Sequence, residues 1–182
     1  MRKFVKILIG IGMLALIAGG IIIGLAIKTN AFVKEETVTK ETVLEGDFDD
    51  IFIDIDVSDL TFVYAPDGVS KVVSVEREKR YNEVKVENNK LVITTIDAHH
   101  WYESMFDFNW DKQSVTVYLT KNVFNTLSIK DSTGNIELNN SFTFETATVD
   151  SSTGDINFDS KVNKSLNVSS STGYIAISNQ EL

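Results

Sequence analysis

Cysteine is absent from this chain, and proline is nearly absent. It contains no cysteine, which excludes disulfide bonds, thiol catalysis and thiolate metal sites. It contains a single proline, Pro66, which excludes a proline-rich linker or a stalk that would span a cell wall. A disulfide-stapled scaffold and a thiol enzyme are therefore both ruled out.

Basic residues are scarce beyond the N-terminus. The chain has 17 Lys and Arg against 26 Asp and Glu, and the first 28 residues hold four of the basic side chains and no acid. The other 154 residues therefore carry a formal net charge of −13. This charge argues against nucleic acid and anionic lipid as partners, and the length suffices for one domain with its own core.

The longest hydrophobic run lies at the N-terminus. Residues 7–27 are uncharged and strongly apolar, long enough as a helix to cross the ~30 Å hydrocarbon core of a bilayer. Arg2, Lys3 and Lys6 precede the run and Lys28 follows it. The positive-inside rule then keeps the N-terminus in the cytoplasm and exports the rest. We expect a single-pass cell-membrane protein with an extracytoplasmic C-terminal domain. An exported domain without disulfides fits a bacterial envelope.

A cleaved signal peptide is the competing interpretation, with residues 29–31 as a small-residue cleavage site. The apolar run is longer than the usual signal core of about 7–15 residues, so an uncleaved anchor is favoured. Because no cysteine follows the run, a lipoprotein is excluded. Gly20 and Gly24 form a Gly-x-x-x-Gly pair, a pattern of helix-packing faces that is also common in other membrane helices.

The C-terminal part contains three copies of one phrase. The copies are Leu127–Leu138, Ala147–Phe158 and Leu166–Ile177. Each has alternating apolar residues, a polar turn that ends in Thr-Gly, and a second pair of alternating apolar residues. This pattern predicts two short strands joined by a bend. A period of about 20 residues predicts that successive copies stack as rungs around a shared core.

The glycine of each copy, Gly134, Gly154 or Gly173, is expected to be a structural turn residue. A tight bend between stacked strands calls for positive φ, which glycine adopts without strain. The apolar residues after each glycine should then superpose in two columns: Ile136, Ile156 and Ile175, and Leu138, Phe158 and Ile177.

The remaining segments predict the domain organisation. Residues 1–28 are expected to form the cytoplasmic N-terminus and anchor, residues 29–45 a polar and acidic tether, and residues 46–182 the β-repeat domain, with its rungs over 127–182. Alternating apolar residues predict strands from residue 48 to residue 119, with a hairpin around residues 87–90. The predicted fold is all-β, a β-solenoid or β-helix-like stack of short strands preceded by one transmembrane helix.

The Ser-Thr-Gly-x-Ile rungs, behind a β-rich segment that ends in Ser114–Leu119, resemble a known bacterial family. It is the β-strand-repeat domain of unknown function that is grouped with proposed adhesins, and the resemblance covers about residues 45–180. It implies a β-solenoid on the outer face of the membrane, and some relatives, LiaG-like proteins among them, are encoded beside envelope-stress regulators. The resemblance transfers no catalytic or binding residue. Family members usually have more rungs, whereas this chain stops just after the third.

A segment outside the repeats is unusually aromatic. Residues 97–111 contain a candidate interaction loop: His99, His100, Trp101, Tyr102, Phe106, Phe108 and Trp110. Three interpretations stay open. The rings form a hydrophobic plug over the open end of the first rung, or they bind a sugar or peptide, or His99 and Glu103 contact a metal. The third is disfavoured, because adjacent histidines on an extended chain point in opposite directions.

Two further motifs carry less information. Asp131 and Asp150 precede Thr-Gly as in an aspartic-protease loop, but their spacing to the glycine differs and the third copy has Ser169 in place of Asp150. Asp131 and Asp155 on neighbouring rungs could share a weak cation, although solvated turn residues are the more ordinary explanation. We therefore expect no catalytic residue, no cofactor and no metal.

The residues leave two classes of function. A membrane-anchored, adhesin-like or envelope-associated interaction or stress-accessory module needs no reactive group. A β-helix carbohydrate-active enzyme or sugar-binding protein needs converging carboxylates or basic residues in a cleft. The rungs contain only Lys130, Lys161 and Lys164 as basic residues, so we expect a protein without catalytic activity. Its expected partners are the membrane, an envelope polymer or protein, and a second copy of the chain.

The third copy is followed by residues 178–182 alone. A bare end rung exposes unpaired backbone groups and an apolar row. Three explanations are open: the acidic tail folds over the rung, the gene is truncated, or the rung pairs with another molecule. End-to-end pairing with a second copy is favoured when both copies are held in one membrane plane.

Overall fold

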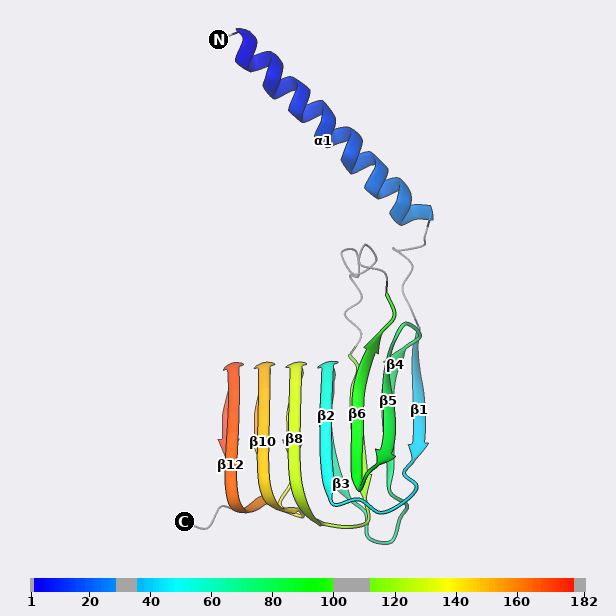
Figure 1. Cartoon of the computed structure of the whole chain (residues 1–182), viewed down its shortest axis with the longest axis vertical. Helices are drawn as coiled ribbons and strands as arrows, with labels where there is room; N and C mark the ends of the chain where they lie inside the picture. The colour runs from blue at the N-terminus through cyan, green and yellow to red at the C-terminus, as the bar shows by residue number, and fades with distance from the viewer. Residues whose placement is uncertain (1, 29–35, 100–111, 179–182) are drawn as a thin grey trace. The chain divides into compact units, whose positions relative to one another are not determined.

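The computed structural model describes residues 2–28, 36–99 and 112–178, which form one helix and two β-sheets (Figure 1). In spatial order, the seven-stranded sheet contains β1 (Thr37–Val43), β4 (Lys71–Arg77), β7 (Ser114–Leu119), β3 (Asp59–Tyr64), β9 (Ile136–Leu138), β11 (Ile156–Phe158) and β13 (Ile175–Ile177). The six-stranded sheet contains β12 (Lys161–Thr172), β10 (Thr143–Thr153), β8 (Val123–Thr133), β2 (Asp50–Val57), β6 (Lys90–Asp97) and β5 (Arg80–Glu87). The expectation of a mostly β chain behind one N-terminal helix is confirmed.

Helix α1 (Arg2–Lys28) contains the predicted membrane segment. Its stretch Phe4–Leu25 has a mean hydropathy of 2.6, and its large apolar side chains are exposed all round. A helix that is apolar on every side suits hydrocarbon better than water. By length and composition, this one is able to cross a membrane.

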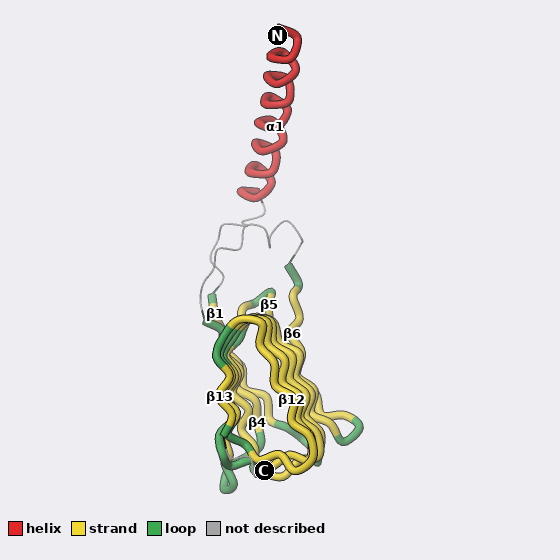
Figure 2. The backbone as a smooth tube through the Cα atoms, turned by 90° about the vertical axis from the view of Figure 1, so that its left-hand side faces the viewer, coloured by secondary structure: helices red, strands yellow, loops and turns green. Residues whose placement is uncertain are grey.

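Each predicted copy forms one rung, here meaning a long strand in the six-stranded sheet, a turn, and a short strand in the seven-stranded sheet. The three rungs are β8–β9, β10–β11 and β12–β13. They pair in parallel and lie directly over one another when viewed along the stack (Figure 2). Both predicted columns are confirmed by the register, which aligns Ile136 with Ile156 and Ile175, and Leu138 with Phe158 and Ile177.

The structure adds rungs that the Thr-Gly pattern does not reveal. β2 and β3 pair in parallel with β8 and β9, so that Leu60 and Phe62 continue the two columns. At the turn of this rung, Val57 and Ser58 stand in place of Thr-Gly. β6 and β7 form another rung beside β2 and β3, and residues 98–113 connect its two strands. The spatial order of the rungs therefore differs from their order along the chain.

The core lies between the two sheets and is built from the inward row of every strand. Ile51 and Ile53 of β2 are fully buried, as expected from strict alternation. Aromatic rings stack from rung to rung at the end of the strands remote from the Thr-Gly turns, with centroids 5.9 Å apart for Phe48 and Phe124 and again for Phe124 and Phe144. Each such buried ring contributes roughly 2–3 kcal/mol to stability.

At the end of the stack opposite to β12–β13, the strands pair in antiparallel fashion. β4 and β5 run antiparallel to β7 and β6, and the predicted hairpin between β5 and β6 is confirmed. Its turn residues Asn88 and Asn89 have φ of 51° and 62°, as a type I′ hairpin turn requires.

β1 corrects the predicted tether. The polar composition of Thr37–Val43 predicts part of the tether, yet these residues form a strand that pairs with β4 along its whole length. Nearly all side chains of β1 are exposed. A strand on a sheet edge without a buried face shows no apolar alternation, which is why the sequence pattern missed it.

Candidate functional site

The candidate interaction loop falls mostly outside the described residues. His99 is half-buried just beyond β6, while His100, Trp101, Tyr102, Phe106, Phe108 and Trp110 lie in the segment that the structure does not describe. The strands on either side of this segment, β6 and β7, are interior strands of their sheets. The rung that leads into the aromatic segment is therefore not an end rung of the stack. Whether the aromatic segment acts as a plug or as a binding loop stays a prediction.

The turn glycines form a column that leaves no space for side chains. A Cβ on Gly154 would lie 1.8 Å from the carbonyl oxygen of Gly134, and one on Gly173 would lie 2.0 Å from that of Gly154. Gly154 and Gly173 have φ of 139° and 140°, which confirms the prediction of positive φ for these two. Gly134 is not at positive φ. It is glycine because a Cβ there would lie 2.0 Å from the Ser58 carbonyl oxygen.

The residues after the glycines bind the turns together. The side-chain oxygen of Asp59 accepts a hydrogen bond from the Asn135 backbone N–H at 2.9 Å, and Asn135 Oδ1 accepts one from the Asp155 N–H at 3.0 Å. Asp155 Oδ1 accepts the next from the Tyr174 N–H at 2.8 Å. Carboxylate or amide oxygens thus satisfy backbone donors from rung to rung. Tyr174, the last member, offers no equivalent acceptor to a further rung.

Asp131 is the one carboxylate of the repeats that faces the core, in register with Ser151 of the next rung. It is 2% exposed, and neither of its oxygens has a hydrogen-bond partner among the described residues. Burial raises the pKa of Asp131 from 3.8 to about 7, and the nearby backbone N–H groups of Ser132 and Thr133 lower it only in part. Asp155 is exposed, so the structure gives these two carboxylates separate surroundings instead of one shared cation site.

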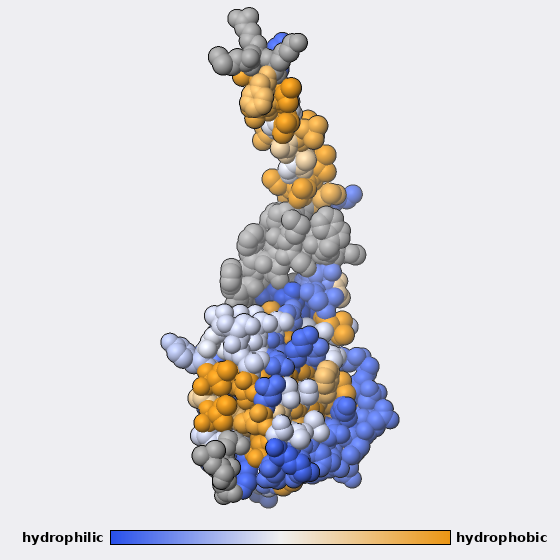
Figure 3. Space-filling model, turned by 60° about the vertical axis from the view of Figure 1, so that its left-hand side comes forward, coloured by the Kyte–Doolittle hydropathy of each residue, from blue (hydrophilic) through white to orange (hydrophobic). Residues whose placement is uncertain are grey.

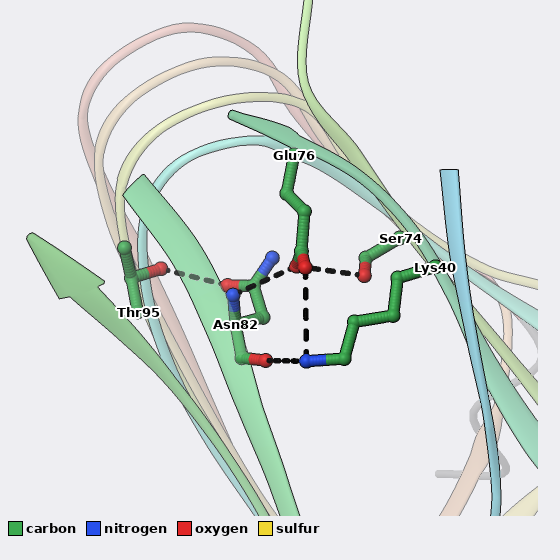
Figure 4. Close-up of polar contacts among 5 residues, drawn as sticks. All are labelled: Lys40, Ser74, Glu76, Asn82 and Thr95. Atoms are coloured by element: carbon green, nitrogen blue, oxygen red, sulfur yellow. Dashed lines mark hydrogen bonds and ion pairs between the residues drawn. The ribbon is translucent and has the colours of Figure 1, made fainter. Parts of the chain in front are cut away.

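A polar network closes the core at the antiparallel end (Figure 4). Glu76 Oε2 accepts hydrogen bonds from Ser74 Oγ at 3.0 Å and from the Asn82 backbone N–H at 2.9 Å. Lys40 Nζ, from β1, lies 3.7 Å from Glu76 Oε1. Thr95 Oγ1 donates to Asn82 Oδ1 at 2.9 Å. Glu76 is buried, and its partners compensate the cost of taking a charge out of water.

An open pocket of about 620 Å³ lies among the loops remote from the Thr-Gly turns. Asp49 and Lys121 form an ion pair at its wall. Hydrogen bonds from Asn89 and Lys121 lower the pKa of Asp49. Phe48 and Phe124 also line the pocket, but these rings are only 7% and 2% exposed, so their faces are used in packing.

The comparisons with known proteins agree with this architecture. A model of the Toastrack DUF4097 domain matches residues 48–182, which include every rung. The chain belongs to the Toastrack family. The resemblance seen in the Ser-Thr-Gly rungs is thereby confirmed, and comparison with curated proteins gives no match.

Several solved structures are similar to this chain at low sequence identity. A proposed cell adhesion protein from Clostridium sporogenes aligns at 9% identity and a TM-score of 0.51, over 80% of this chain and 100% of that one. A proposed adhesin from Parabacteroides distasonis aligns at 15% identity and a TM-score of 0.45, over 80% and 66%. A proposed lipid-binding protein from the same species aligns at 9% identity and a TM-score of 0.36, over 81% and 98%. The first of these likenesses concerns the fold alone.

The most distinctive surface of this Toastrack domain is its terminal rung, β12–β13 with its turn. Along the first column, Ile136 and Ile156 are 1% exposed but Ile175 is 41% exposed. Along the second, Phe158 is fully buried but Ile177 is 46% exposed. Apolar side chains gather on this face of the domain (Figure 3). The terminal rung thus presents a half-exposed core row.

Most of the terminal rung is also free of charge, since its charged residues, Lys161 and Lys164, lie at the start of β12. Residues 165–178 contain no Asp, Glu, Lys or Arg, whereas the aligned stretch of the preceding rung contains Asp150, Asp155 and Asp159. The absence is visible in the sequence, although its meaning depends on the rung being an edge. Across the described residues, no group of three or more His, Asp or Glu is placed to hold a metal ion. The geometry of this rung offers recognition by edge pairing and apolar contact.

Proposed function

We propose that this Toastrack protein is a membrane-anchored, extracytoplasmic interaction module without catalytic activity, adhesin-like or associated with the cell envelope. The observation that carries the proposal is the terminal rung, a surface that is uncharged over residues 165–178 and has an exposed apolar row and strand edges that pair with no further described strand. Such patches mark sites of protein association on soluble domains. Helix α1 supplies a segment suited to anchoring the domain, and the rungs, as a β-solenoid, supply a rigid support.

The second candidate, a carbohydrate-active enzyme or sugar-binding protein, would use the open pocket. A glycosidase acid needs a raised pKa, but the pKa of Asp49 is lowered by Asn89 and Lys121. Sugar binding by stacking needs exposed ring faces, but Phe48 and Phe124 are buried. Both observations favour the interaction module.

The aromatic loop, His99 to Trp110, is a second proposed interaction element. Ala98 and Lys112 are described residues on either side of the loop, and they adjoin the ends of β6 and β7 at which the Thr-Gly turns of the other rungs lie. β1 also begins at this end, since Thr37 pairs with Arg77 and Val75 pairs with Ser114. The described strand ends next to the loop and the described start of β1 therefore lie at the same end of the two sheets.

The anchored topology can be tested by cysteine labelling, because the chain has no cysteine of its own. Glu87→Cys places a thiol on the exposed β5–β6 turn, and Lys6→Cys places one before the apolar run. In intact cells, a membrane-impermeant maleimide should label Glu87→Cys, and should label Lys6→Cys only after permeabilisation. The chain should stay in the membrane pellet after carbonate extraction. Reversed labelling, or release of the chain by carbonate, would overturn the proposal.

A further inference from the structure

We infer that the terminal rung of this protein docks on the terminal rung of a second copy, so that the chain forms a two-fold pair joined at this edge. The inference rests on the proposed function only in taking this rung to be the interaction surface, and it names the partner. Four features of the rung support it: its backbone edges, its apolar row, the absence of charge over residues 165–178, and the end of the hydrogen-bond series that links the turns.

The backbone of the terminal rung is open along both sheets. β12 pairs with β10 and β13 pairs with β11, and each is the last strand of its sheet. The N–H and C=O groups on their outer sides have no other described strand beside them, which makes these edges templates for another chain. An occupant that covers the whole face must match two strand edges and the apolar row between them. An extended peptide fills one edge, whereas a second terminal rung has the required cross-section.

The apolar row continues the core columns to the surface. Leu166 and Val168 are half-buried against Ala147 and Val149 of the rung below. Ile175 and Ile177 retain 41% and 46% of their exposure. In the inner rungs the same positions are closed by the next rung. A facing rung would complete their burial, and burial of apolar surface is the main driving force of stable homodimers.

The distribution of charge over the domain favours a second copy docking at the terminal rung. The 154 residues after position 28 carry a net charge of −13, so two copies repel each other unless they meet where charge is absent. The terminal rung is such a place over residues 165–178. The other sheet edges are charged: β1 has Lys40 and Glu41, and β5 has Arg80, Glu83, Lys85 and Glu87. Charged side chains protect an edge from pairing. On the terminal rung such protection is confined to Lys161 and Lys164 at the start of β12, and Lys164 is paired with Glu145 of the neighbouring strand.

The series of hydrogen bonds that links the turns from rung to rung ends at Tyr174, a residue suited to an interface. Asp59, Asn135 and Asp155 each accept a hydrogen bond from the next rung, but the next position holds Tyr174, which is 84% exposed. If a further rung of the same kind stacked here, its backbone N–H would find no carboxylate or amide oxygen at position 174 to accept its hydrogen bond. Tyrosine supplies a large, rigid contact area instead and is enriched at the energetic centres of interfaces.

The test measures the mass of the full chain in density-matched detergent by analytical ultracentrifugation over a range of concentrations. The wild type should show a monomer–dimer equilibrium. Ile175→Lys places a charge on the exposed edge strand β13 and should weaken the dimer at least about tenfold. Val38→Lys is the matched control, because Val38 is 55% exposed on β1, the other edge strand of the same sheet. This variant should dimerise as the wild type does.

A helix variant and a hydrogen-exchange measurement separate pairing at the terminal rung from other causes of dimerisation. Gly20→Leu with Gly24→Leu removes the small-residue pair of helix α1, and dimerisation should persist. Amide hydrogen exchange of the wild type should show concentration-dependent protection of residues 161–177 but not of residues 37–43, whether or not Ile175→Lys folds. A wild type that stays monomeric, or a dimer indifferent to Ile175→Lys in a folded variant, overturns the inference. Neither result would alter the labelling pattern that tests the anchored topology.

Discussion

Replacement of Asp131 by asparagine should remove a pH dependence of stability that the structure builds into the Toastrack domain. The Asp131 side chain faces the core, is 2% exposed and lies in register with the buried Ser151. Burial raises its pKa from 3.8 to about 7. In the unfolded chain the same carboxyl is solvated and ionises near pH 4. Between these two values the folded protein holds a proton that the unfolded chain has lost.

The sign and size of the effect follow from this difference. Below about pH 4 both states are protonated, so Asp131 does not disfavour folding. As the pH rises from 4 to 7 the unfolded state binds fewer protons, so the free energy of unfolding falls. One unit of pKa difference corresponds to ~1.4 kcal/mol, which makes the full loss at most about 4 kcal/mol. Between pH 5 and pH 8 the loss should be about 2–3 kcal/mol, less if water enters the turn.

The assay is urea unfolding of residues 36–182, followed by circular dichroism at intervals between pH 5 and pH 8. This fragment contains every described strand and the whole core. The difference in unfolding free energy between Asp131→Asn and the wild type should grow with pH by about 2–3 kcal/mol in favour of asparagine. Other carboxylates contribute equally to both proteins and cancel in the difference.

Asp150→Asn is the control, because it removes an exposed carboxylate from the next rung and changes the net charge by the same amount. Its unfolding free energy should follow the pH profile of the wild type. If the curves of Asp131→Asn and the wild type are parallel from pH 5 to pH 8, then Asp131 is ionised in the folded state at neutral pH. Its carboxylate would then have hydration or hydrogen bonds that the geometry does not provide, and the reasoning would fail.

Two further predictions concern the turn glycines and the closed end of the core. Gly154→Ala should lower the free energy of unfolding by about 2 kcal/mol or more, because its turn lies between two others and a Cβ would overlap the Gly134 carbonyl. Gly173→Ala should cost less, since the terminal turn has an outer side free to shift, and Gly68→Ala, whose Cβ would lie 3.3 Å from its nearest neighbour, should be nearly neutral; equal losses at all three would refute the column. Glu76→Ala should lower the free energy of unfolding in urea by about 2–4 kcal/mol, because it leaves the buried Asn82 N–H and Ser74 hydroxyl without an acceptor. Lys40→Ala should lower it by under about 1 kcal/mol, because the lysine side chain is 47% exposed. Similar losses for these two would contradict the view that the hydrogen bonds, and not the ion pair, hold Glu76.

The repeats could be predicted from sequence because their information is local. The strand–turn–strand pattern lies within about 12 residues, and stacking follows from its recurrence. The alternation that placed Ile136 and Ile156 inside the core also puts Asp131 in phase with Leu127 and Ile129, so its inward position was readable in principle. Its altered pKa was not, because burial depends on the neighbouring rungs.

The rest of the fold depends on pairings that no local pattern specifies. The β2–β3 rung was missed because Ser58 stands where the later rungs have glycine. Its neighbour on that side is the rung whose strands are joined by residues 98–113, so no tight Thr-Gly turn stacks there. The parallel pairing of β2 with β6 brings Ile51 beside Leu91 across the intervening β3, β4 and β5. The buried network at Glu76 has the same origin, because Lys40 and Asn82 approach it from separate strands.

The contrast between the two ends of the stack bears on what kind of assembly the protein can form. At the antiparallel end, the inward row of β4 changes from Val72 to Ser74 and Glu76, so the core closes with satisfied polar groups. At the terminal rung the columns stay apolar to the last residue, Ile177. Head-to-tail stacking would press that apolar row against charged β1 and β5 and would leave the new end equally open, which leads to a filament. Two terminal rungs that face each other satisfy both open ends at once, and no further open apolar rung remains. A closed pair is therefore the assembly that the unequal ends favour.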